Sequence, residues 1–256
     1  MTKLSDKDKF LDLSDYGRFF GKFLANRLKK TNTTPIHVTF YFGISGLIAV
    51  YCIYNNYFLI AGLFLILKSS LDAADGELAR LKKTPSYSGR YLDSIFDIIL
   101  NLLILLSISH VSNAEILSVS LAFIGMQLQG TLYNYYYVIL RNKSIGGDKT
   151  SKIFENKTPK ALPGEKQKLV NILYIVFRVC YIIFDSTIYF IDQNAYKVKT
   201  FPNWFMTFLS IYGLGFQLLI IAVMLPLGLK NYILPFFIYY SLLILVLIGA
   251  RRLFIK

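Results

Sequence analysis

The chain has 256 residues, of which 55% are hydrophobic and 16% aromatic, and its formal net charge is +13. Its mean hydropathy is +0.49. A soluble globular domain rarely combines these values, so the composition excludes an ordinary soluble enzyme and indicates a membrane protein.

The first 34 residues are predicted to form a cytoplasmic N-terminus that contains an amphipathic helix. Within residues 10–28, apolar side chains recur at helical spacing and charged side chains lie opposite them. The apolar set is Leu13, Tyr16, Phe20, Phe23, Leu24 and Leu28, and the charged set is Asp15, Arg18, Lys22 and Lys29. We expect this helix to lie on the anionic inner leaflet of a membrane or to pack on the protein's own cytoplasmic face.

Residues 35–256 are predicted to form one membrane domain, an all-α polytopic bundle of about six transmembrane helices. Each expected span has about 20 mainly apolar residues, which is the length that crosses a bilayer as a helix. The expected spans are residues 35–54, 56–75, 91–110, 114–138, 204–225 and 232–250. Six spans place both basic termini on the cytoplasmic side, as the positive-inside rule favours.

The stretch that joins the second and third spans is the most informative part of the chain. It follows the pattern D-x2-D-G-x2-A-R-x8-G-x3-D-x3-D. The residues at its fixed positions are Asp72, Asp75, Gly76, Ala79, Arg80, Gly89, Asp93 and Asp97. A cluster of carboxylates beside hydrocarbon is unfavourable by several kcal/mol unless a cation neutralises it, so the stretch predicts a cation site.

Helical geometry brings the four aspartates of this pattern together. At about 100° per residue, the first two share a helix face with Gly76 and Ala79, and the last two follow Gly89 along one ridge of the next helix. Residues 82–88 include a proline and two serines and can turn the chain back. The two faces then form an all-oxygen site, which suits Mg²⁺, Mn²⁺ or Ca²⁺ better than zinc.

Two charged residues that are not fixed positions of the pattern have open roles. Lys68 lies one helical turn before Asp72 inside an apolar segment, where an unpaired lysine is unfavourable. It either balances the carboxylates, with Asp72 as its i, i+4 partner, or contacts a substrate phosphate. Glu77 is expected to point about 140° away from Asp72, toward solvent or a neighbouring helix.

Residues 142–203 are predicted to form a cytoplasmic loop followed by an interfacial helix. Residues 169–193 are apolar enough to span the membrane but contain Arg178, Asp185 and Asp192. If they crossed, the basic C-terminus would lie on the opposite side from the N-terminus, so the charge distribution favours an interfacial or re-entrant helix. The alternative is a crossing helix in which Arg178 pairs with a carboxylate inside the bundle.

At every fixed position, the pattern resembles the signature of the CDP-alcohol phosphotransferases, also called CDP-alcohol phosphatidyltransferases. These are integral membrane enzymes of phospholipid synthesis. With average residue usage, a chance match of this kind in a chain of this length is expected roughly once in ten million. The pattern covers about a tenth of the chain, and the hydrophobic layout around it agrees with the family's six-helix architecture.

The resemblance implies roles for the site residues. Asp72, Asp75 and Asp93 would bind one or two Mg²⁺ or Mn²⁺ ions, and Asp97 would complete the site. Asp93 and Asp97 are the expected catalytic residues, with Asp97 as the general base for the acceptor alcohol. Gly76, Ala79 and Gly89 would leave room for the nucleotide, whereas Arg80, Arg90 and Lys68 are the candidate phosphate contacts.

The resemblance also implies the reaction, in which a phosphatidyl or other substituted phosphate group passes from a CDP-linked donor to a small alcohol and CMP is released. CDP-diacylglycerol is the expected donor, and a CDP-inositol or CDP-choline type of donor is the alternative.

A carboxylate-lined cation transporter is a rival from another class, but the chain shows no internal repeat and its acids gather near one face. Expected partners are membrane lipids and a second copy in a homodimer, with no nucleic acid. The active site is expected to face the cytoplasm, at a bacterial inner membrane or a eukaryotic endomembrane.

Overall fold

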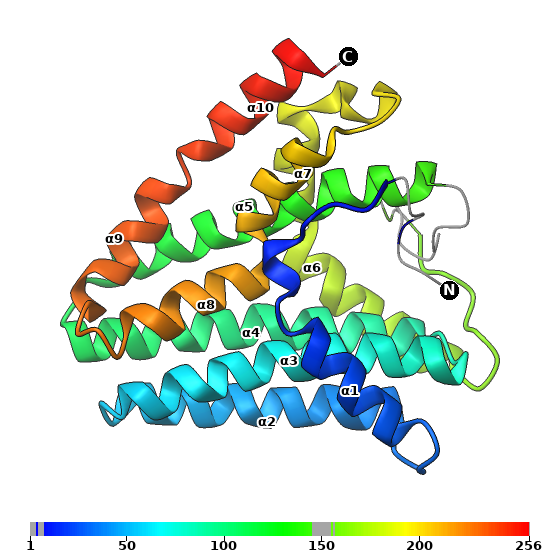
Figure 1. Cartoon of the computed structure of the whole chain (residues 1–256), viewed down its shortest axis with the longest axis horizontal. Helices are drawn as coiled ribbons and strands as arrows, with labels where there is room; N and C mark the ends of the chain where they lie inside the picture. The colour runs from blue at the N-terminus through cyan, green and yellow to red at the C-terminus, as the bar shows by residue number, and fades with distance from the viewer. Residues whose placement is uncertain (1–3, 5–7, 145–154, 156, 256) are drawn as a thin grey trace.

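The computed structural model describes residues 4, 8–144, 155 and 157–255, and within these residues the fold is helical with no strand (Figure 1). In chain order the elements are the 3-10 helix η2 (Leu13–Asp15), α1 (Arg18–Leu28), α2 (Pro35–Tyr54), α3 (Phe58–Lys82), α4 (Tyr87–Ser112), α5 (Ile116–Lys143), α6 (Gln167–Ile191), η3 (Gln193–Lys197), α7 (Asn203–Leu209), η4 (Ser210–Tyr212), α8 (Leu214–Met224), α9 (Lys230–Tyr240) and α10 (Leu243–Phe254). The all-α prediction is confirmed. Residues 145–154 and 156 of the predicted loop before α6 lie outside the described residues.

Among the described residues, five helices are long and apolar enough to cross a membrane. They are α2, α4, α5, α6 and the run Lys230–Phe254, and the bent pair of α7–η4 and α8 makes a sixth if it counts as one span. The predicted number of about six therefore agrees, but the membership differs. Helix α6 qualifies on length and composition, whereas α3 does not, because Lys68, Asp72 and Asp75 interrupt its apolar sequence.

Helices α2, α3 and α4 run side by side in the bundle (Figure 1), and α2 packs against both of the others. Local sequence sets where each one begins and ends. The side chain of Thr34 caps α2, Ser86 caps α4, and α3 ends just before Lys83, whose backbone is left-handed with φ 55°. The short connection between α3 and α4 thus reverses the chain as predicted, and it brings the two halves of the aspartate pattern to the same end of the bundle.

Helix α1 is shorter than the predicted amphipathic segment and packs against α3. Its buried residues are the small Gly21 and Ala25, while Phe20 and Phe23 are 45% and 53% exposed. Two residues of the expected apolar face, Leu24 and Leu28, are partly buried against Val38, Ala74 and Leu78, whereas its two phenylalanines remain exposed. The small residues of α1 allow it to approach α3 closely.

The two ends of α6 are bound by different helices of the bundle, the first by the start of α4 and the second by the last turns of α5. Before α6, Glu165 accepts hydrogen bonds from the Ser86 hydroxyl (2.8 Å) and the Ser88 backbone N–H (2.7 Å). After α6, the Asp192 carboxylate accepts a hydrogen bond from Tyr136 (2.6 Å), and Lys143 donates to the Tyr196 carbonyl (2.6 Å). These contacts hold both ends of α6 on the bundle, and α6 is long and apolar enough to cross a membrane, so its interfacial or re-entrant course stays a prediction from the charge distribution.

The interfacial course expected for α6 predicts which side of the membrane its flanks face. Single cysteines at Lys160, at Asn194 and at the C-terminus, in a variant without Cys52 and Cys180, should all react with an impermeant thiol reagent from the cytoplasmic side only. Lys160 and Asn194 are both exposed, so their reactivity reports sidedness and not burial. Reaction of the Asn194 cysteine from the opposite side would show that α6 crosses the membrane.

Candidate metal centre

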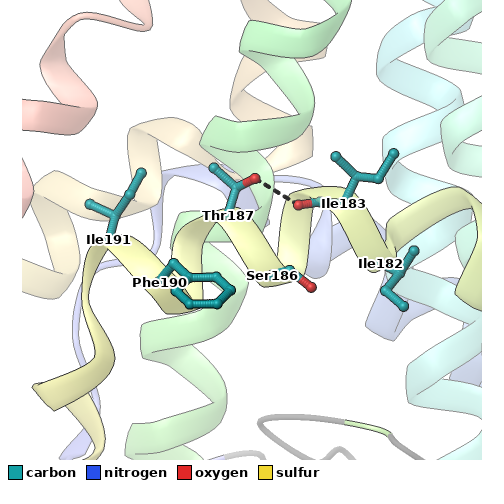
Figure 2. Close-up of a pocket in the computed structure, with 6 residues that line it drawn as sticks. All are labelled: Ile182, Ile183, Ser186, Thr187, Phe190 and Ile191. Carbon is teal, nitrogen blue, oxygen red and sulfur yellow. Dashed lines mark hydrogen bonds between the residues drawn. The ribbon is translucent and has the colours of Figure 1, made fainter.

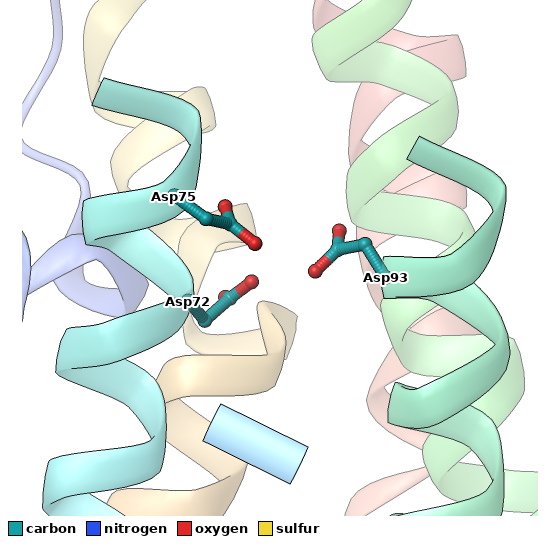
Figure 3. Close-up of side chains that lie close together, drawn as sticks. All are labelled: Asp72, Asp75 and Asp93. Atoms are coloured by element: carbon teal, nitrogen blue, oxygen red, sulfur yellow. The ribbon is translucent and has the colours of Figure 1, made fainter. Parts of the chain in front are cut away.

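Three aspartates from two helices meet at one point in the bundle. Asp72 and Asp75 project from α3 toward Asp93 on α4 (Figure 3), and one carboxylate oxygen from each lies within 4.8 Å of the others. We call this set the aspartate trio. The spacing on α3 places two carboxylates on one face, and the reversal between α3 and α4 places the third opposite them.

The aspartate trio fits a divalent cation. The Oδ1 atom of Asp93 is buried and has no hydrogen-bond partner among the described residues. Asp75 is oriented from a third helix, since the Thr39 hydroxyl of α2 donates to its Oδ2 at 2.7 Å. Three carboxylates this close repel one another in a partly buried position unless a cation neutralises them. An all-oxygen donor set suits Mg²⁺ or Mn²⁺.

Asp97, the fourth predicted ligand, lies next to Lys68 and not in the trio. The Lys68 ammonium donates to Asp97 Oδ1 at 2.6 Å, and the Lys68 side chain is fully buried. The sequence interpretation paired Lys68 with Asp72 along one helix. Because α4 runs antiparallel to α3, Asp93 lies level with Asp72 and Asp75, and Asp97 lies one turn further, level with Lys68. The predicted set of four carboxylates is thus a trio and an adjacent ion pair.

The small residues of the pattern differ in what surrounds them. A Cβ placed on Gly76 would touch only the Arg80 guanidinium, at 3.6 Å, so the helix surface above Gly76 is open. A Cβ on Gly89 would lie 3.2 Å from the Ser86 hydroxyl that caps α4. Ala79 lies in the last turn of α3, where its carbonyl accepts a hydrogen bond from Thr84 (3.0 Å). Gly76 is therefore the position with space for a ligand, and Gly89 also has a local structural reason to be small.

Both arginines predicted to contact phosphate are paired with glutamates. Arg80 lies 3.1 Å from Glu77 on the same helix. Arg90 lies 2.5 Å from Glu155, and its guanidinium stacks over the Tyr91 ring at 4.7 Å. No sequence pattern predicts the Glu155 contact, because Glu155 lies in a loop 65 residues away. Arg80 lies on the face of α3 that carries Asp72 and Asp75, and its guanidinium is above Gly76.

A buried polar cluster outside the pattern was not predicted. The Arg251 Nε donates to Asp192 at 2.7 Å, Tyr136 donates to the same carboxylate oxygen, and Asp192 is 1% exposed. The signal in the sequence was the presence of charged residues at the ends of apolar segments. The cluster joins α5, the end of α6 and α10, and it has a structural role remote from the trio.

A shallow cavity of about 470 Å³ lies on α6 (Figure 2). Its lining residues are Ile182, Ile183, Ser186, Thr187, Phe190 and Ile191, and none of them is ionisable. The Thr187 hydroxyl donates to the Ile183 carbonyl at 2.8 Å within the helix. This cavity has no group suited to acid–base or metal chemistry, so the trio is the better candidate for the functional site.

Comparison with known proteins agrees with the motif. The model of the CDP-alcohol phosphatidyltransferase family matches residues 32–229, which include the whole aspartate pattern and more than half of the chain. Neither a search of curated proteins nor a search of solved structures finds a match.

Proposed function

Because the chain belongs to the CDP-alcohol phosphatidyltransferase family, we propose that it transfers a phosphatidyl group from CDP-diacylglycerol to a small alcohol and releases CMP. Membership of the family implies transfer of a phosphatidyl group from a CDP-alcohol. The observation that supports the proposal is the aspartate trio, since three residues of the family pattern converge on one point of the bundle. The long apolar helices fit an integral membrane protein, where a lipid donor and a lipid product would reside.

Each part of the site has a proposed role in binding the donor. Held by Asp72, Asp75 and Asp93, one or two Mg²⁺ or Mn²⁺ ions would supply positive charge to the diphosphate and to the departing CMP. The open helix surface at Gly76 leaves room for the cytidine and ribose. The Arg80 guanidinium, placed above Gly76, can offer two parallel N–H groups to phosphate oxygens.

Asp97 is the proposed general base. It would take the proton of the acceptor hydroxyl as the acceptor oxygen bonds to the donor phosphorus and the bond from that phosphorus to CMP breaks. To do so it must lie within about 3 Å of the hydroxyl when the acceptor is bound. Lys68 donates a hydrogen bond to Asp97 and fixes the orientation of the carboxylate. The full burial of Lys68 favours this balancing role over a direct contact with phosphate.

The identity of the substrates is tested by a panel assay. Purified protein with Mg²⁺ and CDP-diacylglycerol is offered serine, glycerol phosphate, inositol, inositol phosphate or choline, and CMP and the lipid product are measured. A phosphatidyl product with one of these acceptors supports the proposal. A product formed only when CDP-inositol or CDP-choline replaces CDP-diacylglycerol would contradict the proposed donor and leave the reaction class intact. No CMP release from any donor would contradict the function.

Gly76→Leu is expected to abolish binding of the CDP donor while the protein still folds. A Cβ at this position fits, but the rest of a leucine side chain would occupy the space beside Arg80 that the nucleotide needs. Binding is measured by titration of detergent-purified protein with CDP in Mg²⁺. Gly249→Leu on α10 is the control, because a Cβ there meets nothing within 4 Å. Unchanged CDP affinity in Gly76→Leu would show that the glycine serves helix packing only.

A further inference from the structure

We propose that Arg18 and Glu77 are positioning residues that hold the Arg80 guanidinium at the donor phosphates, so that α1 is part of the donor site. The proposal rests on the proposed function. Helix α1 spans Arg18–Leu28 and precedes the residues 32–229 that match the family. The family match therefore assigns no role to it.

Arg80 is aimed at the donor site by its place on α3. Asp72, Gly76 and Arg80 follow one another at i, i+4 and i+8, so they lie along a single ridge of the helix. Side chains on a helix point back toward its N-terminus, and the Arg80 guanidinium accordingly lies above Gly76. This location is next to the aspartate trio and is where a diphosphate bound by the trio would extend.

Glu77 fixes Arg80 through both of its carboxylate oxygens. Arg80 Nη2 lies 3.1 Å from Glu77 Oε1, and Arg80 Nε donates to Oε2 at 3.4 Å. The Glu77 side chain is only 13% exposed and the Arg80 side chain 20% exposed. An i, i+3 pair on an open helix surface would contribute little. Here partial burial and the two-oxygen geometry restrict the guanidinium to one orientation.

Arg18 fixes Glu77 from a different helix. Its Nε donates to Glu77 Oε1 at 3.1 Å, and its Nη1 lies 3.2 Å from Asp15 Oδ2. The result is a row of alternating charges that leads from Asp15 through Arg18 and Glu77 to Arg80. Without Arg18, Glu77 would hold Arg80 from within α3 alone, and both side chains could adopt other rotamers.

The backbone of α1 is in direct contact with α3, so the position of Arg18 is defined. A Cβ on Gly17 would lie 2.9 Å from the Ser70 Cα, and a Cβ on Gly21 would lie 3.0 Å from the backbone of Ala73. Only glycine allows this approach. The segment before α1 is also fixed, since the Leu13 backbone N–H donates to the Ser210 hydroxyl at 2.9 Å.

An arginine that is already oriented loses less side-chain freedom when it binds phosphate, so the row of charges should raise affinity for the donor without changing the chemical step. Arg18→Gln is therefore expected to weaken CDP binding and raise the donor KM about tenfold while kcat stays close to the wild-type value. The control is Lys22→Gln, which removes the same charge from an exposed position on α1 and should leave affinity unchanged.

A double-mutant cycle separates positioning from general effects. In an Arg80→Gln background, Arg18→Gln should cause no further loss of CDP affinity, because the guanidinium it positions is absent. An equal loss in both backgrounds would overturn the proposal, as would equal effects of Arg18→Gln and Lys22→Gln. CDP affinity is measured by titration in Mg²⁺ on variants with wild-type thermal stability. A wild-type protein that binds CDP but transfers nothing would overturn the proposed function alone, and one that does not bind CDP would overturn both.

Discussion

Asp72→Asn, Asp75→Asn and Asp93→Asn are each expected to lower the rate of transfer by more than about a hundredfold. Each substitution keeps the size of the side chain and removes one negative charge from a site built only of carboxylate oxygens. Stability should change less than activity, because the three carboxylates repel one another when no cation is bound. Initial rates at saturating donor and a range of Mg²⁺ concentrations would measure the effect.

The matched control for these variants is Glu115→Gln, which removes an exposed carboxylate at the start of α5, far from the trio in the chain. It should transfer at the wild-type rate. Treatment of the wild-type protein with EDTA should also abolish transfer, and added Mg²⁺ or Mn²⁺ should restore it. A wild-type rate in any of the three aspartate variants, or full turnover after metal removal, would contradict the assignment of the trio.

Lys68→Met is expected to destabilise the protein by about 3–5 kcal/mol. The substitution would leave the Asp97 carboxylate without its ion-pair partner and beside three further carboxylates, in a position where Lys68 itself is fully buried. Thermal unfolding of the detergent-solubilised protein would show this as a lowered midpoint.

The companion variant is Lys68→Met combined with Asp97→Asn, which removes both charges of the pair. Breaking a buried ion pair on one side is far more unfavourable than replacing both partners, so the double variant should be more stable than Lys68→Met. A double variant as unstable as the single one would mean that Lys68 stabilises the fold through its contacts with apolar neighbours, such as the Phe42 ring 5.0 Å from its ammonium.

The aspartate trio could be predicted because it depends on local rules. Helical periodicity fixed which residues share a face of α3, and Pro85 with the flanking serines indicated the reversal into α4. The partner of Lys68 could not be predicted in the same way. It depends on how far α4 is displaced along α3, which is set by the packing of both helices on α2.

Contacts between segments distant in the sequence were the main limit of prediction. The periodicity of residues 10–28 indicated a helix, but it gave no sign of the close approach to α3 that requires glycine at positions 17 and 21. Glu155 and Asp192 each neutralise an arginine across more than 50 residues. Such pairs cannot be recognised from helical periodicity, because their separation in the sequence is set by the tertiary fold and not by the repeat of a single helix.

Anomalous X-ray diffraction from crystals grown with Mn²⁺ and CDP would test the proposed site most directly. We expect an anomalous peak between Asp72, Asp75 and Asp93, with the cytidine above Gly76 and a phosphate oxygen in contact with Arg80. The peak should be absent from crystals of Asp93→Asn grown in the same way. A Mn²⁺ peak elsewhere in the chain, or none between the three aspartates with CDP bound, would contradict the assignment of this cluster as the catalytic metal centre.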